Sequence, residues 1–454
     1  MRAGVARVCI TPPVGTWQGG YAGRNRPSEG VYGELFARAL VLAESEGAPR
    51  AAIVSLDVVS LPHAVAEAAR RQAEERTGIP AGSIALCASH THSGPSTGDA
   101  RRDEGYLRVF EKQIAGAVSV AARDLRPAEI RLGRGRAGFN VNRRLPTPRG
   151  IGGPYPEGPV DHEVRILRVD AIPEGDPDYI QANGSPMALL FRFNCHATTG
   201  PALPKGGYNL HGDYPGAAAG FIERAYEGAT VAMFLQGCSG DVRPNLITPE
   251  KVFRGAAYPN EVHAMGRELG AAAIAAAEAA AFGQMPGSAP GNVGVAGKTI
   301  LLPYDKPPSA DELRQLLQGG RWPNGRALHE TDRAWAEKTL AQTEAGTLPE
   351  GMPAEVQVFR LGAYWLATLP GDVFVEVGWA VRDAVAAAAD VSPAHVVVAS
   401  YANGSVGYVP TASAMALGGY EPTSYRLGGR PACYVPEAQE ILARTAAGLA
   451  AELA

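Results

Sequence analysis

The sequence lacks any hydrophobic run long enough to cross a membrane. Its longest apolar stretch, near residues 271–282, is rich in alanine and contains Glu278, whereas a membrane-spanning helix needs about 20 consecutive apolar residues. The first six residues enter an expected strand directly and contain no apolar signal-peptide core. We therefore expect a cytoplasmic protein without stable membrane insertion.

Neither sign of charge dominates the composition. The chain has 42 Lys and Arg residues against 46 Asp and Glu residues, which gives a formal net charge of −4. A protein that binds nucleic acid or an anionic membrane surface usually has a basic excess. We therefore expect a small-molecule substrate and no nucleic-acid partner, and we leave open whether the chain forms a homo-oligomer.

Cysteine is scarce and scattered. The five cysteines lie far apart in mostly apolar contexts, and an odd number does not suit a disulfide framework. We expect buried free thiols in a reducing compartment. The residues are Cys9, Cys87, Cys195, Cys238 and Cys433.

What the sequence does contain is typical of a large globular enzyme. Its 454 residues are 46% hydrophobic and 19% charged, with 55 glycines and 36 prolines that predict many tight turns and shaped loops. Strand patterns, such as residues 35–43, alternate with helix patterns, such as residues 64–77 and 261–281. We expect an α/β (α+β) fold of mixed β-sheets layered with helices, in a single catalytic body spanning residues 1–454. Residues 284–353, between Pro/Gly-rich connectors, predict an inserted subdomain or peripheral layer.

A His-x-His motif follows one of the most apolar strand patterns. Residues 83–88 predict a strand, His90 and His92 follow it, and Gly94-Pro95 then turns the chain. Because residues i and i+2 share one face of a strand, the two imidazoles are expected to point the same way. Zinc can use such a pair, although the pair alone also fits ordinary polar residues at a turn.

Polar side chains recur where other predicted strands end. His196 follows a strand over residues 187–194, Asp241 follows one over residues 230–236, and Asp372 follows one over residues 363–369. In α/β proteins, the carboxyl ends of strands are where sites are built. Two histidines and one carboxylate would form a zinc-ligand set, and zinc lowers the pKa of a bound water to about 7. The alternatives are a core histidine for His196 and a helix N-cap for Asp372.

The chain resembles the neutral/alkaline (non-lysosomal) ceramidase superfamily in segments that cover most of its length. The His-Thr-His-Ser-Gly-Pro piece, with the other segments in order, makes the resemblance specific. The segments are residues 4–12 (Gly-Val-Ala to Ile-Thr-Pro), 89–95, 142–143 (Asn-Arg), His196, 240–245 (Gly-Asp-Val-Arg-Pro-Asn), 369–372 (Leu-Pro-Gly-Asp) and 408–411 (Tyr-Val-Pro-Thr).

The resemblance implies a zinc amidohydrolase with defined residue roles. Arg143 is implied to bind the substrate carbonyl or oxyanion, and His92 to act near the metal as a proton shuttle or orienting group. The implied metal ligands are His90, His196, Asp372 and Tyr408.

The sequence departs from the ceramidases in four ways. Asp372 stands where ceramidases carry Glu, which makes Glu376 an alternative ligand. A serine considered important in ceramidases falls on Gly237, with Ser239 close by. The chain also stops where ceramidases continue into a C-terminal β-sandwich domain, and it has no signal peptide. We therefore expect a small soluble substrate rather than a membrane lipid.

Our hypothesis is a Zn²⁺-dependent hydrolase of an amide bond, with an ester or lactone as the alternative. Arg143 and Tyr408 are expected to stabilise the oxyanion, and His92 or Asp241 to transfer protons. The glycine-rich loop of residues 17–24 is either a flexible turn or a loop over the pocket. The candidate substrate-binding residues are Tyr21, Arg24, His211 and Gly237.

Two rival hypotheses come from other classes of protein. The Gly237 and Asp372 departures also suit a binding protein that retains the fold without the chemistry. A two-metal phosphoester hydrolase is the other rival, and it would need two metal ions per chain. Its additional ligands would be Asp57, Asp213, His92 and His211.

Overall fold

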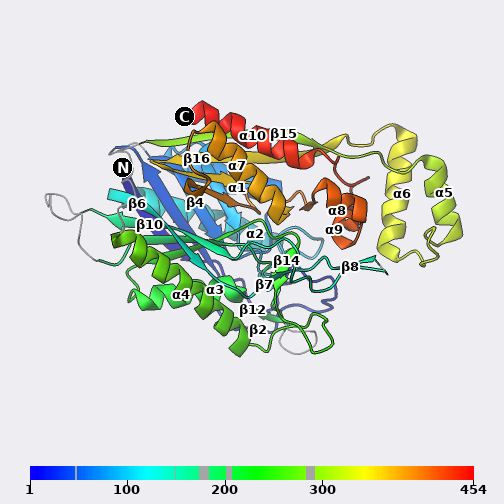
Figure 1. The fold of residues 1–454 in the computed structure, drawn as a ribbon, viewed down its shortest axis with the longest axis horizontal. Coiled ribbons are helices and arrows are strands. Elements are labelled where there is room, and N and C mark those ends of the chain that lie inside the picture. The colour runs from blue at the N-terminus through cyan, green and yellow to red at the C-terminus, as the bar shows by residue number, and fades with distance from the viewer. Residues whose placement is uncertain (46–48, 149, 173–183, 201–206, 283–291) are drawn as a thin grey trace.

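The computed structural model describes residues 1–45, 49–148, 150–172, 184–200, 207–282 and 292–454. In these residues, two large β-sheets pack face to face and helices cover both outer faces, so that the molecule has four layers (Figure 1). This arrangement confirms the predicted α/β (α+β) class of mixed sheets layered with helices.

The larger sheet has the order β13-β11-β10-β6-β1-β3-β4-β5. Most neighbouring strands are antiparallel, whereas β4 pairs with β5 and β11 pairs with β13 in parallel. Its strands are β1 (Arg2–Cys9), β3 (Phe36–Ala43), β4 (Pro49–Leu56), β5 (Ile84–Ala88), β6 (Arg126–Arg136), β10 (Glu163–Ala171), β11 (Ala188–Phe193) and β13 (Val231–Gln236).

The second sheet has the order β15-β16-β17-β19, with β17 and β19 parallel. Its strands are β15 (Val293–Pro303), β16 (Gly351–Leu361), β17 (Tyr364–Thr368) and β19 (Val396–Ala399). Short strand pairs connect the loops beyond both sheets. They are β2 (Gly30–Val31) with β12 (Asn209–Leu210), β7 (Asn140–Asn142) with β14 (Val242–Pro244), β8 (Pro146–Thr147) with β9 (Gly150–Ile151), and β18 (Asp372–Val373) with β20 (Tyr408–Val409).

The outer helices divide between the two sheets. In Figure 1, α3 and α4 lie along one side of the molecule and α7 and α10 along the opposite side. Helices α1 to α4 pack on the larger sheet, and α7 and α10 pack on the second sheet. The helices are α1 (His63–Thr77), α2 (Glu104–Arg123), α3 (Asp213–Ala225), α4 (Asn260–Phe282), α5 (Ala310–Gly319), α6 (Glu330–Ala345), α7 (Val375–Ala388), α8 (Ala412–Leu417), α9 (Tyr420–Thr423) and α10 (Ala438–Leu453).

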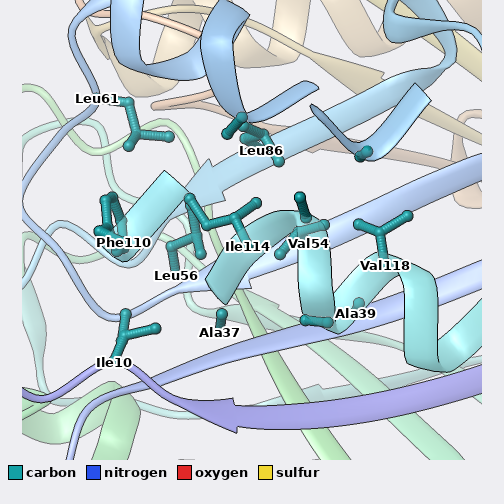
Figure 2. Close-up of a cluster of buried hydrophobic side chains, with 14 of the residues drawn as sticks. Ile10, Ala37, Ala39, Val54, Leu56, Leu61, Leu86, Phe110, Ile114 and Val118 are labelled. Carbon is teal, nitrogen blue, oxygen red and sulfur yellow. The ribbon is translucent and has the colours of Figure 1, made fainter. Parts of the chain in front are cut away.

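Successive side chains of a strand point to opposite faces of the sheet, so one strand contributes to the hydrophobic clusters on both sides of it. On β3, Ala37 and Ala39 face α2, whereas Leu40 and Leu42 face the second sheet. Figure 2 shows the first of these clusters, in which Phe110 and neighbouring α2 side chains cover β3 and β4. Strand β3 is therefore buried on both faces, which explains why its sequence is almost continuously apolar.

Strand β6 is longer than the sequence predicts. The pattern indicates a strand only over residues 130–132, but β6 runs from Arg126 to Arg136. The sequence pattern does not indicate the full length of β6 because it contains Gly133 and Gly135, and glycine usually weakens a strand. Here a Cβ at these positions would lie 2.4 and 2.7 Å from carbonyl oxygens of α4, so glycine allows the helix to lie directly on the strand.

Residues 284–353 do not fall in one layer. Residues 284–291 lie outside the described residues, β15 and β16 belong to the second sheet, and α5 and α6 project together at one end of the molecule (Figure 1). Ser309 and Glu312 form a capping box at the start of α5, as a Ser-x-x-Glu spacing favours. An inserted subdomain over this range stays a prediction. In the described part of the chain, no helix has the length and apolarity needed to span a membrane.

The α2 cluster gives a direct test of the core. Phe110 is fully buried on α2, whereas the adjacent Val109 is 52% exposed. We expect Phe110→Ala to lower the free energy of unfolding by about 3–5 kcal/mol, because it removes a buried ring and leaves a cavity. Val109→Ala is the matched control and should change it by less than about 0.5 kcal/mol. Denaturant titration followed by circular dichroism measures both, and equal effects would contradict this view of the core.

Candidate metal centre

Three predicted ligands meet beyond the carboxyl ends of strands from both sheets. His90 follows β5, His196 follows β11, and Asp372 follows β17. The Oδ1 atom of Asp372 lies 3.5 Å from Nε2 of His90 and 3.4 Å from Nε2 of His196. The two imidazole rings cross edge to face, with centroids 4.4 Å apart. The helix N-cap alternative for Asp372 is wrong, since the N-cap of α7 is Phe374.

The hydrogen bond made by Nδ1 of each imidazole determines which tautomer is present. Nδ1 of His90 lies 2.7 Å from the Val59 carbonyl oxygen, and Nδ1 of His196 lies 2.8 Å from that of Ser239. A carbonyl can only accept, so both Nδ1 atoms carry the proton and donate. Each Nε2 lone pair therefore faces the Asp372 carboxylate, in the orientation usual for metal-binding histidines.

Burial keeps these imidazoles neutral. It lowers the pKa of His90 to about 3, with His196 adding to the effect, and it also lowers the pKa of His196. For Asp372, burial alone raises the pKa, but His90, His196 and Arg143 reverse the shift and lower it overall. Neutral nitrogens beside an ionised carboxylate are the protonation states that bind a cation.

The spacing of the donor atoms fits a tetrahedral zinc ion. Zinc–ligand bonds of about 2.0–2.2 Å place tetrahedral ligand atoms roughly 3.3–3.6 Å apart, and the two Asp372 distances of 3.4 and 3.5 Å lie in this range. Within the described residues, His90, His92 and His196 form the one group of three histidine, cysteine or acidic side chains close enough to share a metal ion.

His92 differs from the other two histidines. Its Nε2 lies 3.0 Å from Nε2 of His90, but its Nδ1 has no hydrogen-bond partner among the described residues. Gly20 rests on the ring, since a Cβ there would lie 2.5 Å from it, and the Tyr21 ring lies 4.9 Å away. The glycine-rich loop of residues 17–24 therefore covers the candidate site, as one of the two sequence interpretations expected.

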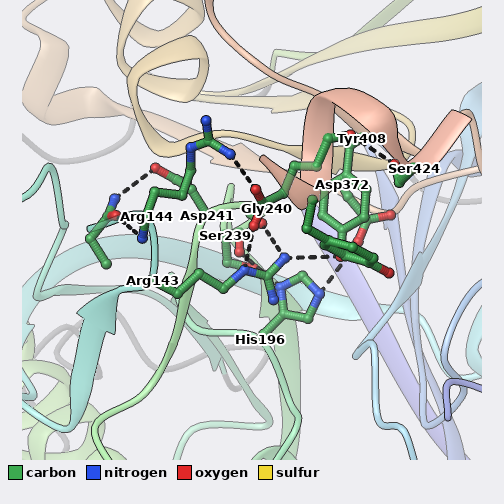
Figure 3. A network of polar contacts seen from close by, with 12 residues as sticks. Arg143, Arg144, His196, Ser239, Gly240, Asp241, Asp372, Tyr408 and Ser424 are labelled. Atoms are coloured by element: carbon green, nitrogen blue, oxygen red, sulfur yellow. Dashed lines mark hydrogen bonds and ion pairs between the residues drawn. The ribbon is translucent and has the colours of Figure 1, made fainter. Parts of the chain in front are cut away.

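Tyr408 and Arg143 complete one wall of the centre (Figure 3). The Tyr408 ring lies almost parallel to that of His196, with centroids 6.2 Å apart, and β20 pairs Tyr408 with Asp372 of β18. Nη2 of Arg143 donates to the Tyr408 hydroxyl at 2.9 Å and to the Gly240 carbonyl at 2.7 Å. Its Nε donates to Glu421 at 2.8 Å, so the guanidinium group is held from three directions.

Two other predicted residues lie beside the centre but point elsewhere. The Asp241 carboxylate accepts hydrogen bonds from the Asn142 side chain and the Val375 backbone at the start of α7, and burial raises its pKa to about 7. Gly237 faces Asn194, whose Oδ1 would lie 1.7 Å from a Cβ at that position. The proposed roles of both in the reaction stay predictions.

The remaining substrate-binding candidates divide between two places. The Arg24 guanidinium lies 4.9 Å over the Tyr21 ring, and both belong to the loop that covers His92. His211 instead borders a separate pocket of about 330 Å³, where its ring lies 4.7 Å from that of Tyr258. The backbone of His211 is joined to the segment that carries His92, because its carbonyl oxygen accepts from the Thr91 hydroxyl and its N–H donates to the Ser93 carbonyl.

The other ligand candidates have partners of their own. Asp57 forms an ion pair with Arg38 at 2.9 Å, and Asp213 accepts from the backbone N–H groups of Thr199 and Tyr214. Glu376 borders a separate pocket of about 230 Å³ beyond Asp241. These contacts favour Asp372 over Glu376 as the carboxylate ligand and do not support the two-metal arrangement.

Sequence reasoning missed two residues of this site. The Tyr401 hydroxyl donates to Oδ1 of Asp372 at 3.2 Å, and Glu421 forms ion pairs with both Arg143 and Arg144. Tyr401 ends an apolar strand pattern, which is the signal that identified the histidines, but its aromatic ring made it resemble another core residue. Glu421 carries no comparable signal, because its partners lie more than 270 residues away in sequence.

A cavity borders Tyr408, which is the one candidate ligand in its lining. It has a volume of about 590 Å³, and its lining combines apolar groups such as Met352 and Leu427 with polar and charged groups such as Lys338 and Arg430. Pockets of roughly 300–1,000 Å³ hold small organic ligands, so the cavity is large enough for part of a substrate.

The fold and the sequence both match known proteins. A neutral ceramidase from Pseudomonas aeruginosa is 26% identical over 90% of this chain, and one from Mycobacterium tuberculosis is 23% identical over 86%. These matches span 66% and 68% of the relatives' lengths. The crystal structure of the P. aeruginosa enzyme superposes on the whole chain with a TM-score of 0.74 and 21% identity, covering 74% of that chain.

A second solved structure, described as a ceramidase complexed with C2, gives a TM-score of 0.73 at 21% identity over the whole chain and 75% of its own. These two structures establish the shared fold. Residues 1–257, more than half of the sequence, match the family described as "Neutral/alkaline non-lysosomal ceramidase, N-terminal". The chain therefore belongs to the neutral/alkaline non-lysosomal ceramidase family.

Proposed function

We propose that the protein is a zinc-dependent hydrolase that cleaves an amide bond. The observation that carries this proposal is the pair of imidazoles, His90 and His196, each oriented by a backbone carbonyl so that its Nε2 faces Asp372. The relatives are named neutral ceramidases, and a ceramidase cleaves an amide bond, which supports the same reaction class here.

The proposed ligands are His90, His196 and Asp372, with the Tyr408 hydroxyl as the fourth. A zinc ion held by these residues would lower the pKa of a water molecule to about 7 and polarise the substrate carbonyl. His90 adopts a left-handed backbone conformation, with φ of 61°. Such strain in a residue with a Cβ occurs at active sites and at ligand clamps, so it suits a functional site of either kind.

Arg143 is suited to stabilise the oxyanion that forms when an amide carbonyl is attacked. Its guanidinium group is always charged, and its contacts with Glu421 and the Gly240 carbonyl fix its direction before substrate binds. Burial lowers its pKa, but the neighbouring Tyr408 and Glu421 outweigh this and raise it overall. A donor that needs no reorganisation contributes most to electrostatic catalysis.

His92 is suited to carry a proton between water and the leaving amine. It is neutral, because burial lowers its pKa, and its Nδ1 is not committed to a carbonyl. A neutral imidazole next to the attacking water can accept its proton and return it to the leaving nitrogen. Asp241 stays the alternative proton carrier, although its carboxylate oxygens already accept two hydrogen bonds.

For the substrate class, we propose an N-acyl amide with an apolar chain. The sequence alone favoured a small soluble molecule, whereas the relatives are named for ceramide, which is a lipid. The cavity of about 590 Å³ beside Tyr408 has apolar lining groups such as Met352 and Leu427, which support an apolar substituent. A cytoplasmic location and a homo-oligomer stay predictions.

The first test measures the zinc content and the amide-hydrolysing activity of the same purified protein. We expect the purified protein to contain about one zinc per chain and to release fatty acid from ceramides or N-acylethanolamines. His90→Ala and His196→Ala should lose both properties, because each removes a ligand. Elemental analysis and mass spectrometry of the products measure them. His329→Gln, which alters an exposed histidine at the start of α6, is the control. A zinc-loaded protein inactive on every amide, and on matched esters, would contradict the proposal.

The second test separates His92 from the ligands. We expect His92→Gln to keep about one zinc per chain and to lower kcat by at least about 100-fold, because proton transfer typically contributes a factor of 100 to 10,000. Zinc content and kcat are measured on the same preparation. Loss of zinc in this variant would instead make His92 a third histidine ligand.

The third test concerns Arg143. We expect Arg143→Ala to lower kcat by about 100- to 1,000-fold, the usual effect of removing one oxyanion donor. Glu421 keeps Arg144 as its partner, so folding and zinc content should be retained. Arg254→Ala, which breaks an ion pair with Glu261 on the surface, is the matched control and should leave kcat unchanged. A kcat within a fewfold of wild type for Arg143→Ala would refute the assignment.

A further inference from the structure

Tyr401 connects the chain segments that bring the candidate ligands together. It follows β19 and is 2% exposed. Its backbone N–H donates to the Gly371 carbonyl at 3.3 Å, next to Asp372, and its own carbonyl accepts from Ala88 N–H at 3.1 Å, two residues before His90. The backbone of one residue thus ties the ends of two strands that carry ligands.

The side chain of Tyr401 reaches the same two ligands. Its ring lies over the imidazole of His90, with centroids 4.1 Å apart at an angle of 35°, and its hydroxyl lies 3.2 Å from Oδ1 of Asp372. The hydroxyl is also 3.5 Å from Nδ1 of His196. That nitrogen already donates to the Ser239 carbonyl, so it offers no lone pair, and the Tyr401 proton goes to Asp372.

Oδ1 of Asp372 is the oxygen that lies near both Nε2 atoms. A carboxylate oxygen has two lone pairs. A hydrogen bond from Tyr401 to one of them leaves the other directed at the point between the two imidazoles. The hydroxyl therefore selects which oxygen of Asp372 faces that point and fixes its direction.

The backbone of Tyr401 is held in an unfavourable conformation. Its φ is 59°, close to the 61° of His90, and both residues carry a Cβ that disfavours this left-handed region. The ring-to-ring contact with His90 joins the two strained residues directly.

We propose that Tyr401 is a positioning residue of the metal centre. Its hydroxyl orients the Asp372 carboxylate and its ring holds the His90 imidazole, so that the site is formed before the metal binds. The inference rests on the metal centre of the proposed function. The hydroxyl orients the carboxylate, which packing of the ring alone would not do.

The deciding variant is Tyr401→Phe, which removes only the hydroxyl. We expect the zinc dissociation constant, measured by competition with a chromogenic chelator, to rise about 10- to 100-fold, the usual effect of losing a group that orients a ligand. We also expect the visible spectrum of the cobalt-substituted protein to change, because the carboxylate is free to turn. Neither readout depends on catalysis.

Tyr106→Phe is the matched control. Tyr106 is also buried, and its hydroxyl donates to the Ile10 carbonyl in the α2 cluster, away from the ligands. The control should leave zinc affinity and the cobalt spectrum unchanged, even if both variants lower the unfolding temperature of the metal-free protein. Zinc affinity and a cobalt spectrum equal to wild type in Tyr401→Phe would overturn the inference.

A double-mutant cycle with Asp372→Asn tests whether the Tyr401 hydroxyl affects zinc affinity through the Asp372 carboxylate. If Tyr401 acts through the carboxylate, adding Tyr401→Phe to Asp372→Asn should cause little further loss of zinc affinity, whereas independent effects would multiply. Multiplication would overturn the inference while leaving the metal centre intact. Absence of zinc binding by the wild-type protein would overturn the proposed function itself, and the inference with it.

Discussion

The site depends on backbone hydrogen bonds that join strand ends within the second sheet and between the two sheets. Ser400 N–H donates to the Gln236 carbonyl at the end of β13, Tyr401 N–H to Gly371 beyond β17, and Asn403 N–H to Leu86 in β5. These bonds hold the carboxyl edges of the two sheets together, in addition to the apolar cluster between the sheets and buried polar contacts such as that of Arg192 with the Val398 carbonyl. Oδ1 of Asp372 is therefore held within 3.5 Å of Nε2 of His90 and of His196, which lie more than a hundred residues away in sequence.

The protonation and pairing of the groups in the centre follow from the burial of their side chains. A neutral imidazole costs little to bury, whereas an isolated ion costs much more, so His90 and His196 are neutral and the charged groups are paired. Arg143 and Arg144 share Glu421, and Asp372 receives a hydrogen bond from Tyr401. Two arginines with one glutamate leave one positive charge, and the Asp372 carboxylate balances it. This pairing reduces the free-energy cost of burying these charged groups.

Strand periodicity in the sequence predicted the fold class and also pointed to the candidate ligands. Strand periodicity locates buried strands, and His90, His196 and Asp372 all follow such strands directly. It did not predict β6, because Gly133 and Gly135 resemble strand breakers until the α4 backbone is seen lying on them. It could not predict the ion pairs of Glu421 or that of Asp57 with Arg38, because no local pattern links partners so far apart. Tyr401 was missed because its proposed role depends on its hydroxyl group, whereas its ring resembles that of any core aromatic residue.

The close contact between Gly237 and Asn194 limits how this family member can change. No side chain fits at position 237 while the Asn194 amide remains where it is, since even a methyl group would overlap it. Asn194 in turn donates to Asp161, and the same carboxylate oxygen also accepts from Arg192. Acquiring a serine at this position would therefore require Asn194 to move or to be replaced as well. Residue 237 and residue 194 are thus expected to change together rather than singly.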